Sequence, residues 1–542
     1  MKKRLFHWKS VFFLSVILLI ILLFQVLKND FMALPDSGFS RGILLDQVDI
    51  PKGYDAYYSD YFVSLVKNNK LYLISSDENG LTIKSFDSSA KQIDSFSLDE
   101  YKSYSKLKAH FEGNQIILNT YNEQTRDLVF ITIDLQKKQA SVEHQIKLKD
   151  HRILTLAPQF VLYGTDDALI LDTIAQKITV ANPRYIETLA YTIDSNDNSI
   201  WIAYTDYVDS RYQLNLKHLD SNFKTLSSHP SLFNFNAGGA TKPQELALQI
   251  SGNKLNLLSV IKDNKTGVNT AYLLTAEKTN PAVIASKFFN AYTYSMQPTF
   301  YDTPKETQLI VSTKTNIGRV EIGANGSFQN LVTLDLQLKE IKSLTKSTSV
   351  TLSPQMNEMG DYNYLCYLQI NQGIGKIMLS SNHPEIIQLS KKSTVAENFN
   401  ILMTSLTTFL PLSYISLIIE AYVLTPVMLV IILLSMFFLT WSERNGSKLI
   451  ILAISIHMIF KNLFILNHMI QSSETLTHFP IFLNSPLKLL GWELLLTLSS
   501  LYCLWNYKKQ HPHTHYLMQY LFFNLIDVTL FTMLFAPYYL LT

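Results

Sequence analysis

The distribution of Lys and Arg around five apolar segments constrains this chain more than any other feature of its sequence. The first segment runs from Trp8 to about Leu27, is nearly all apolar, and follows Lys2, Lys3 and Arg4. Four more apolar segments are packed after residue 420, and the stretch between is polar and rich in short β-like runs. A helix needs about 20 apolar residues to cross a bilayer. The sequence therefore predicts a large polar domain held between membrane anchors.

The N-terminal segment resembles a removable signal peptide in its basic start and apolar centre. However, the residues that follow it (28–33, KNDFMA) lack a small-x-small cleavage pattern, and they contain no cysteine for lipoprotein processing. We therefore interpret residues 1–30 as a cytoplasmic basic start and an uncleaved transmembrane anchor.

Orientation follows from the rule that basic loops stay in the cytoplasm. The basic start places residues 31–395 outside, and the loop 467–484 contains no Lys or Arg, which favours the outside as well. The basic residues of the other loops, Arg444, Lys448, Lys508 and Lys509, then all fall inside. The prediction is a multi-pass cell-membrane protein with a cytoplasmic N-terminus and an extracytoplasmic C-terminus. Its later spans are expected at about 421–441, 449–466, 486–505 and 517–540.

One apolar stretch does not fit five spans. Residues 396–420 are long enough to cross, but they are interrupted by Pro411 and by many Ser and Thr residues. If they crossed, every later basic loop would face outward. We interpret them as an interfacial or re-entrant segment ahead of a transmembrane bundle at 421–542, with a six-span arrangement as the alternative.

The outer region reads as all-β. Short runs rich in Val, Ile, Leu, Tyr and Thr are separated by Asn, Asp and Gly, as in antiparallel hairpins. Clear pairs are 70–75 with 81–86, 115–120 with 128–134, 199–204 with 212–217, and 254–262 with 270–275. A weak repeat begins near Asn69, Asn114, Asn198, Asn253 and Asn363. Its spacing fits multiples of the 40–50 residues of a propeller blade, so about seven blades are expected, with a β-sandwich as the alternative.

Composition excludes some classes of function. The net charge of +2 gives no electrostatic footprint for a nucleic acid. The two cysteines, Cys366 and Cys503, fall in different predicted compartments and form no disulfide framework. A large outer domain with one cysteine favours a bacterial, Gram-positive-like envelope.

Known chemical motifs are missing from the sequence. We find no nucleophile elbow, phosphate-binding glycine loop or zinc-protease helix, and we assign no catalytic, cofactor-binding or metal residues. His511, His513 and His515 alternate as a metal-binding tract would, but they adjoin two lysines and are interpreted as a solvated basic loop. An extracellular hydrolase stays an alternative, because glycosidase carboxylates can come from distant blades.

Two groups of residues are candidates for binding or coupling. The first is a tyrosine cluster in YDAYYSDYF, which could stack on a glycan or anchor a peptide, or could simply pack between blades. It comprises Tyr54, Tyr57, Tyr58 and Tyr61.

The second group consists of ionisable and polar residues within the apolar segments: His457, Lys461, Glu493, Asn524 and Asp527. At about 1.5 Å of rise per residue, the four ionisable ones lie roughly 12–18 Å from the cytoplasmic ends of their spans. A lone charge in hydrocarbon is costly, so these side chains should face one another. They predict either a structural lock, with Lys461 paired to Glu493 or Asp527, or a proton or ion relay.

The cytoplasmic parts are too small for a kinase, nucleotide-binding or DNA-binding domain. The favoured interpretation is a non-enzymatic envelope protein whose outer domain binds a protein, peptide or glycan and whose bundle docks another integral membrane protein. The alternatives are a small ion- or solute-coupled transporter component that uses the intramembrane residues, and a membrane-anchored hydrolase.

Overall fold

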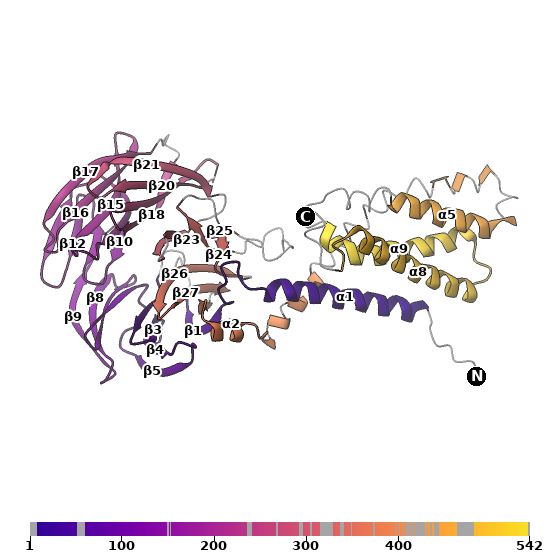
Figure 1. The fold of residues 1–542 in the computed structure, drawn as a ribbon, viewed down its shortest axis with the longest axis horizontal. Coiled ribbons are helices and arrows are strands. Elements are labelled where there is room, and N and C mark those ends of the chain that lie inside the picture. Colours follow the sequence, from indigo (N-terminus) through magenta and orange to yellow (C-terminus); the bar gives the residue numbers. More distant parts are fainter. Residues whose placement is uncertain are drawn as a thin grey trace. The chain divides into compact units, whose positions relative to one another are not determined.

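The computed structural model divides the chain into two compact units (Figure 1), which are described separately. One unit comprises Leu34–Thr315 and Ser327–Lys392, and the other contains Met1–Ala33, Asn316–Gly326 and Ser393–Thr542. The structure describes residues 8–539 except 51–59, 149–150, 152, 236–240, 267–268, 292–295, 304–305, 315–328, 337–340, 348, 372–373, 396, 400, most of 404–443, and 463–481.

The larger unit is a seven-bladed β-propeller. Its described strands form seven four-stranded sheets, in each of which neighbouring strands run antiparallel. Blade 1 consists of β2 (Phe62–Lys67), β3 (Lys70–Ser76), β4 (Leu81–Phe86) and β5 (Gln92–Leu98). Blade 2 consists of β6 (Lys106–Glu112), β7 (Gln115–Asn122), β8 (Asp127–Asp134) and β9 (Gln139–Lys147). Blade 3 has the shortest strands: β10 (Ile153–Leu156), β11 (Val161–Gly164), β12 (Leu169–Asp172) and β13 (Lys177–Ala181).

The next three blades repeat this order with longer strands. Blade 4 consists of β14 (Ile186–Ile193), β15 (Ile200–Val208), β16 (Arg211–Leu219) and β17 (Thr225–Asn234). Blade 5 consists of β18 (Thr241–Ser251), β19 (Lys254–Asp263), β20 (Asn269–Glu277) and β21 (Asn280–Ala291). Blade 6 consists of β22 (Met296–Asp302), β23 (Thr307–Lys314), β24 (Gln329–Asp335) and β25 (Ile341–Ser343). The first strand of each blade adjoins the first strand of the next, so these strands form the inner ring.

The two ends of the propeller meet in blade 7. Its strands β26 (Val350–Met359), β27 (Tyr362–Asn371) and β28 (Ile374–Ser381) are completed by β1 (Ile43–Asp49), which pairs antiparallel with β28. A short helix, α2 (Pro384–Ser390), follows β28 and begins with its proline. Blade 7 thus contains both the first and the last strand of the domain, and this pairing closes the ring of blades.

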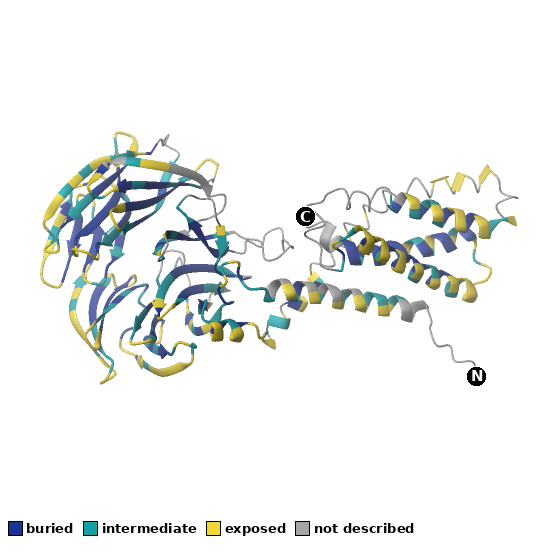
Figure 2. Cartoon of the chain, in the orientation of Figure 1, coloured by how far each residue is buried: buried dark blue, intermediate teal, exposed yellow. Residues whose placement is uncertain are grey.

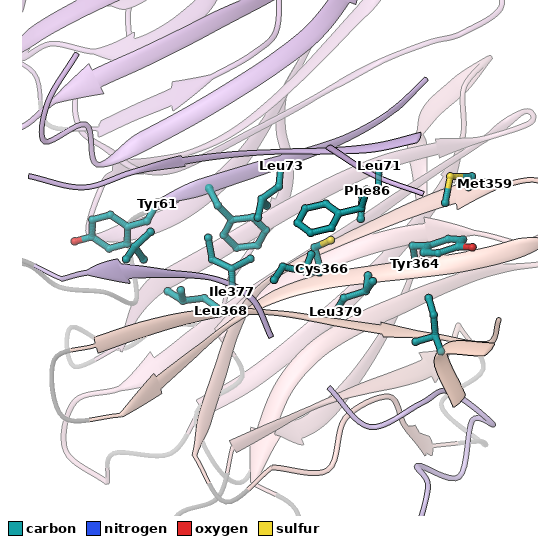
Figure 3. Close-up of a cluster of buried hydrophobic side chains, with 14 residues drawn as sticks. Tyr61, Leu71, Leu73, Phe86, Met359, Tyr364, Cys366, Leu368, Ile377 and Leu379 are labelled. Carbon is teal, nitrogen blue, oxygen red and sulfur yellow. The ribbon is translucent and has the colours of Figure 1, made fainter. Parts of the chain in front are cut away.

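A hydrophobic cluster fills each of the seven interfaces between neighbouring blades. Figure 3 shows the one at the closure, where Phe86 and Leu73 of blade 1 face Cys366 and Leu379 of blade 7. Figure 2 shows the same pattern along the blades, with buried residues concentrated in the middle strands. Side chains of a strand alternate between its two faces, and here both faces of a blade pack against neighbours, which explains the nearly continuous apolar strands.

The turns of the hairpins follow from local chemistry. Lys67 pairs with Lys70 across the two-residue turn Asn68-Asn69, and both asparagines have positive φ, 50° and 56°. Such a turn matches the twist of the two strands, and Asn tolerates this backbone region. The other four marks of the predicted repeat also lie in or beside the turn between the first and second strands of a blade, in blades 2, 4, 5 and 7. The weak repeat therefore marked real blades.

The sequence prediction of a seven-bladed propeller is confirmed, and the β-sandwich alternative is wrong. Each of the four predicted strand pairs is present, as β3 with β4, β7 with β8, β15 with β16, and β19 with β20.

An inter-blade hydrogen-bond chain links the inner strands of blades 5, 6 and 7. The backbone N–H of Gln297 donates to the Glu245 carboxylate, and the N–H of Ser353 donates to Oε1 of Gln297. All three residues lie at β-bulges, where an extra residue turns a polar group toward the next blade. Oε2 of Glu245 is enclosed and has no hydrogen-bond partner in the described structure. Burial raises the pKa of Glu245 to about 8.

The second unit contains four described helices: α1 (Trp8–Met32), α5 (Gly446–Lys461), α8 (Pro486–Gln510) and α9 (Tyr516–Tyr539). Helix α9 contacts the other three, and α1 also contacts α8. Helix α8 extends five residues beyond the predicted end at Trp505, since Tyr507, Lys508 and Lys509 continue it until Pro512 prevents further helix. Helix α5 begins three residues before the predicted 449, and the predicted end at 463–466 lies outside the described residues.

Among the described residues, two helical segments have the length and apolar composition needed to cross a membrane, Pro486–Gln510 and Tyr516–Phe535. The apolar part of α5, Gly446–Ile459, is shorter. Most of the predicted span at 421–441 lies outside the described residues, as does most of the 396–420 segment. A capping box between Thr394 and Glu397 lies at the start of that segment. The N-terminal anchor and the five-span arrangement therefore stay predictions.

Candidate functional site

The ionisable residues of the C-terminal helices come together in one buried cluster. His457 and Lys461 are four residues apart on α5 and so occupy one face of that helix. Glu493 comes from α8 and Asp527 from α9. The four side chains are at most 3% exposed. In helices that are otherwise mostly apolar, the four side chains thus lie together, away from solvent.

Asp527 is the centre of the cluster. Its Oδ2 atom accepts a hydrogen bond from Lys461 Nζ at 2.6 Å, and Nε2 of His457 lies 3.1 Å from the same oxygen. Lys461 Nζ also lies 3.1 Å from Oε1 of Glu493, without the alignment of a hydrogen bond. One ammonium group therefore bridges two carboxylates from two other helices. This arrangement fixes α5, α8 and α9 to one another through a single cation.

Aromatic and hydroxyl side chains surround the charges. Lys461 Nζ lies 4.1 Å from the ring centroid of Phe531, one turn beyond Asp527 on α9, in cation–π geometry. The His457 ring makes edge contacts with Tyr520 and Phe523. Thr497 lies one turn after Glu493 and donates to the Met458 sulfur at 3.3 Å. The sequence prediction missed these residues, although helical spacing from Glu493 and Asp527 could have found Thr497 and Phe531.

Asn524 lies one turn before Asp527 on α9 and is only partly buried. Its Oδ1 atom is enclosed without a hydrogen-bond partner in the described structure. The structure therefore places Asn524 beside the cluster and shows no hydrogen bond from its side chain to the four ionisable residues.

The structure describes one residue of the predicted tyrosine cluster, Tyr61. Tyr54, Tyr57 and Tyr58 lie outside the described residues. Tyr61 is 3% exposed and belongs to the hydrophobic cluster between blades 1 and 7 (Figure 3). Of the two alternatives, a binding surface or packing between blades, Tyr61 follows the second, because its position directly before β2 places the ring in the closure interface.

Blade 4 presents an aromatic group, which we call the blade-4 tyrosine patch: the exposed Tyr185 and Tyr207 and the half-buried Tyr212. Tyr185 and Tyr207 are 38% and 37% exposed, and the backbone N–H of Tyr207 donates to the carbonyl of Tyr185. The rings of Tyr207 and Tyr212, cross-strand partners on β15 and β16, have centroids 4.8 Å apart. No local signal marked these residues, since the patch joins the start of β14 to the β15–β16 hairpin.

The described residues contain no group of three or more His, Cys, Asp or Glu side chains arranged to hold a metal ion. His511 and His513 are exposed after the end of α8, and Nδ1 of His515 accepts from the N–H of Leu517 at the start of α9. Cys366 and Cys503 are both buried, and no disulfide joins them.

No family model and no curated protein matches the chain. Solved structures with a similar fold include the N-terminal domain of Nup159, at 10% identity and a TM-score of 0.39, with 64% of this chain and 96% of that chain covered. The Dos1 propeller is 12% identical with a TM-score of 0.37, with coverages of 65% and 97%. A prolyl endopeptidase is 9% identical with a TM-score of 0.38, with coverages of 67% and 52%. At these identities the likeness concerns the propeller alone.

Proposed function

We propose that this chain is a non-enzymatic integral membrane protein of a bacterial cell envelope, and an accessory subunit of an export, envelope or signalling complex. Its propeller binds a protein, peptide or glycan outside the membrane, and its helical bundle docks another integral membrane protein. In this proposal the chain crosses the membrane five times, with a cytoplasmic N-terminus and an extracytoplasmic C-terminus.

The observation that carries the proposal is the buried cluster around Asp527. Lys461 donates a hydrogen bond to Asp527 and forms an ion pair with Glu493 within the chain. Breaking such a buried pair is costly, by about 3–5 kcal/mol, so the cluster is well suited to holding three helices in one arrangement. A fixed arrangement of helices is what a docking subunit needs to present a constant surface to a membrane partner.

The blade-4 tyrosine patch supports a binding role for the propeller. Tyrosine rings supply large contact area with little loss of side-chain freedom, and they are common among the residues that dominate interfaces. The neighbouring ion pair between Lys242 Nζ and Glu187 Oε1, at 2.6 Å, adds polar groups beside the patch. Aromatic rings beside polar groups suit a peptide, a protein loop or a sugar.

The experiment is purification of the tagged full-length protein from native membranes in mild detergent, with quantification of co-purifying proteins. We expect a stoichiometric partner. The double variant Tyr185→Ser with Tyr207→Ser should reduce the amount of this partner that co-purifies by at least about tenfold, which corresponds to the loss of one strong hot spot or two weaker ones. Ile174→Ser is the matched control, because Ile174 is 53% exposed on blade 3 and lies outside the patch. Folded protein that arrives without any stoichiometric partner contradicts the proposal.

A proton relay is the second candidate, and one feature of the cluster favours it. Two carboxylates face a single lysine and an imidazole, so the buried group is electrically neutral only when it holds one further proton. Net charge in a buried site is disfavoured, which favours uptake of that proton. Proton flux into vesicles that contain the protein, abolished by Asp527→Asn without loss of folded protein, would support a relay over a lock.

A further inference from the structure

A basic pocket lies where α5 and α9 begin and α8 ends. It has a volume of about 450 Å³, and its lining includes Arg444, Lys448, Lys508 and His515. No aspartate or glutamate is among the described residues that line it. Three permanently charged cations, two from the start of α5 and one from the end of α8, therefore converge without a lining carboxylate to offset them.

The packing of the helix ends holds this pocket open and positive. Nζ of Lys508, in the last turn of α8, donates to Oγ of Ser447 in the first turn of α5 at 3.3 Å. Gly446 lets α5 approach Tyr516 closely, since a Cβ atom there would lie 3.3 Å from the tyrosine ring. The side chain of Asn445 makes no capping hydrogen bond to α5, and a helix N-terminus carries partial positive charge. The site thus favours an anion.

A second polar group faces the same cavity. Gln519 lines the pocket and is 5% exposed. Its Nε2 atom donates to the carbonyl of Thr514 at 2.8 Å, but its Oε1 atom is enclosed and has no hydrogen-bond partner in the described structure. A buried acceptor without a donor is costly. A ligand that fits here therefore combines an anionic group with a hydroxyl donor.

We propose that this pocket binds the headgroup of an anionic phospholipid of the phosphatidylglycerol type. The phosphate would contact Arg444, Lys448 and Lys508, and a glycerol hydroxyl would donate to Gln519. The inference rests on the proposed membrane placement of α5, α8 and α9, which puts the pocket at the level of cytoplasmic headgroups. Basic pockets between membrane helices on that side are suited to anionic headgroups.

A lipid fits better than a free phosphate because apolar surface begins next to the basic groups. Ile451 and Leu452 follow Lys448 by one turn of α5 and are 65% and 46% exposed. Met518, beside Gln519 on α9, is 53% exposed. These side chains offer a path for acyl chains, which inorganic phosphate would not use.

The test is native mass spectrometry of the full-length protein, released from nanodiscs that contain phosphatidylcholine with or without phosphatidylglycerol. We expect retained phosphatidylglycerol in the wild type. Each Lys or Arg near a charged headgroup changes the affinity for the lipid by about fivefold. The affinity of the triple variant Arg444→Gln, Lys448→Gln, Lys508→Gln for phosphatidylglycerol should therefore be roughly 100-fold weaker. Lys509→Gln is the matched control, since Lys509 is the next residue of α8 but stacks on Trp505 at 3.9 Å.

Two further variants keep the test decisive if the triple variant does not fold. Lys448→Gln alone should weaken retention about fivefold, and Gln519→Glu, which adds a negative charge of nearly the same shape, should weaken it more. Equal retention by wild type and pocket variants would refute the site. Displacement of the lipid by inorganic phosphate at equal concentration would refute the lipid in favour of a soluble phosphate ligand.

These outcomes are distinct from a failure of the membrane proposal itself. A protein that stays soluble without detergent and does not float with lipid vesicles would refute the membrane placement. A protein that inserts but shows no preference for phosphatidylglycerol over phosphatidylcholine would refute only the headgroup site.

Discussion

Replacing Lys461 by Met should be among the most destabilising single changes in the helical unit. The methionine keeps most of the side-chain volume but removes the ammonium group, which lies 2.6 Å from Asp527 and 3.1 Å from Glu493. Two buried carboxylates then lose their shared cation, and Asp527 keeps only His457. Removing one partner of a buried pair costs about 3–5 kcal/mol, so we expect the free energy of unfolding to fall by that amount.

Second changes at each carboxylate should recover part of this loss in a fixed order. Asp527 is hydrogen-bonded to Lys461, while Glu493 is only close to it. We therefore expect Asp527→Asn to restore about 2 kcal/mol to the Lys461→Met protein and Glu493→Gln to restore about 1 kcal/mol, within the range measured for contacting residues. The coupling energies come from two double-mutant cycles.

The assay is unfolding of purified protein in mixed micelles, followed by far-ultraviolet circular dichroism with denaturing detergent as the variable. Lys488→Met is the matched control, because Lys488 is exposed at the start of α8 and donates to Asn484. It should change the free energy of unfolding by less than about 0.5 kcal/mol. If both double variants are as unstable as the sum of their single variants, the three charges are not coupled and the lock interpretation is refuted.

Two predictions concern the propeller. Burial raises the pKa of Glu245 from its ordinary 4.5 to about 8, so between these pH values the folded protein holds a proton that the unfolded chain has lost. The free energy of unfolding should therefore fall by a few kcal/mol as the pH rises through this range. In denaturant titrations at a series of pH values, Glu245→Gln should remove most of this fall. An unchanged slope in the variant would show that Glu245 ionises normally. Gly80→Ala should destabilise the propeller by about 3 kcal/mol, since φ is +146° and a Cβ would lie 2.5 Å from the carbonyl oxygen of Leu98. Gly113→Ala, with φ of +52° and open space around it, should lower the free energy of unfolding by only about 1 kcal/mol when both variants are measured by denaturant titration. Equal losses at the two glycines would contradict the steric argument.

The hairpins of the propeller could be predicted because their signals are local. The two-residue turn at Asn68 and Asn69 and the strands on each side of it lie within about 20 residues, so short-range pattern fixes both. The closure of the ring could not be predicted in the same way. Strand β1 has no local partner, and its pairing with β28 is chosen among many apolar strands of similar composition.

The candidate sites differ in the same way: local spacing predicted the charged cluster, whereas the surroundings of the tyrosines depend on long-range packing. Helical rise alone placed His457, Lys461, Glu493 and Asp527 at similar depth, and their cost in an apolar setting predicted that they would meet. For Tyr61 the sequence left a binding surface and packing between blades as alternatives, because exposure depends on which blade covers a residue, and sequence pattern carries no information about that neighbour.

By itself, the sequence determined the local elements: the apolar helices, the strands with their turns, and the presence of ionisable residues where hydrocarbon would be expected. These follow from periodicity and turn chemistry, which act over a few residues. Only the tertiary structure decided that Lys461 bridges two carboxylates, that Tyr185 and Tyr207 share a surface, and that three helix ends enclose a basic pocket. Such contacts depend on the free energy of long-range packing, in which many partners of similar polarity compete and geometry selects among them.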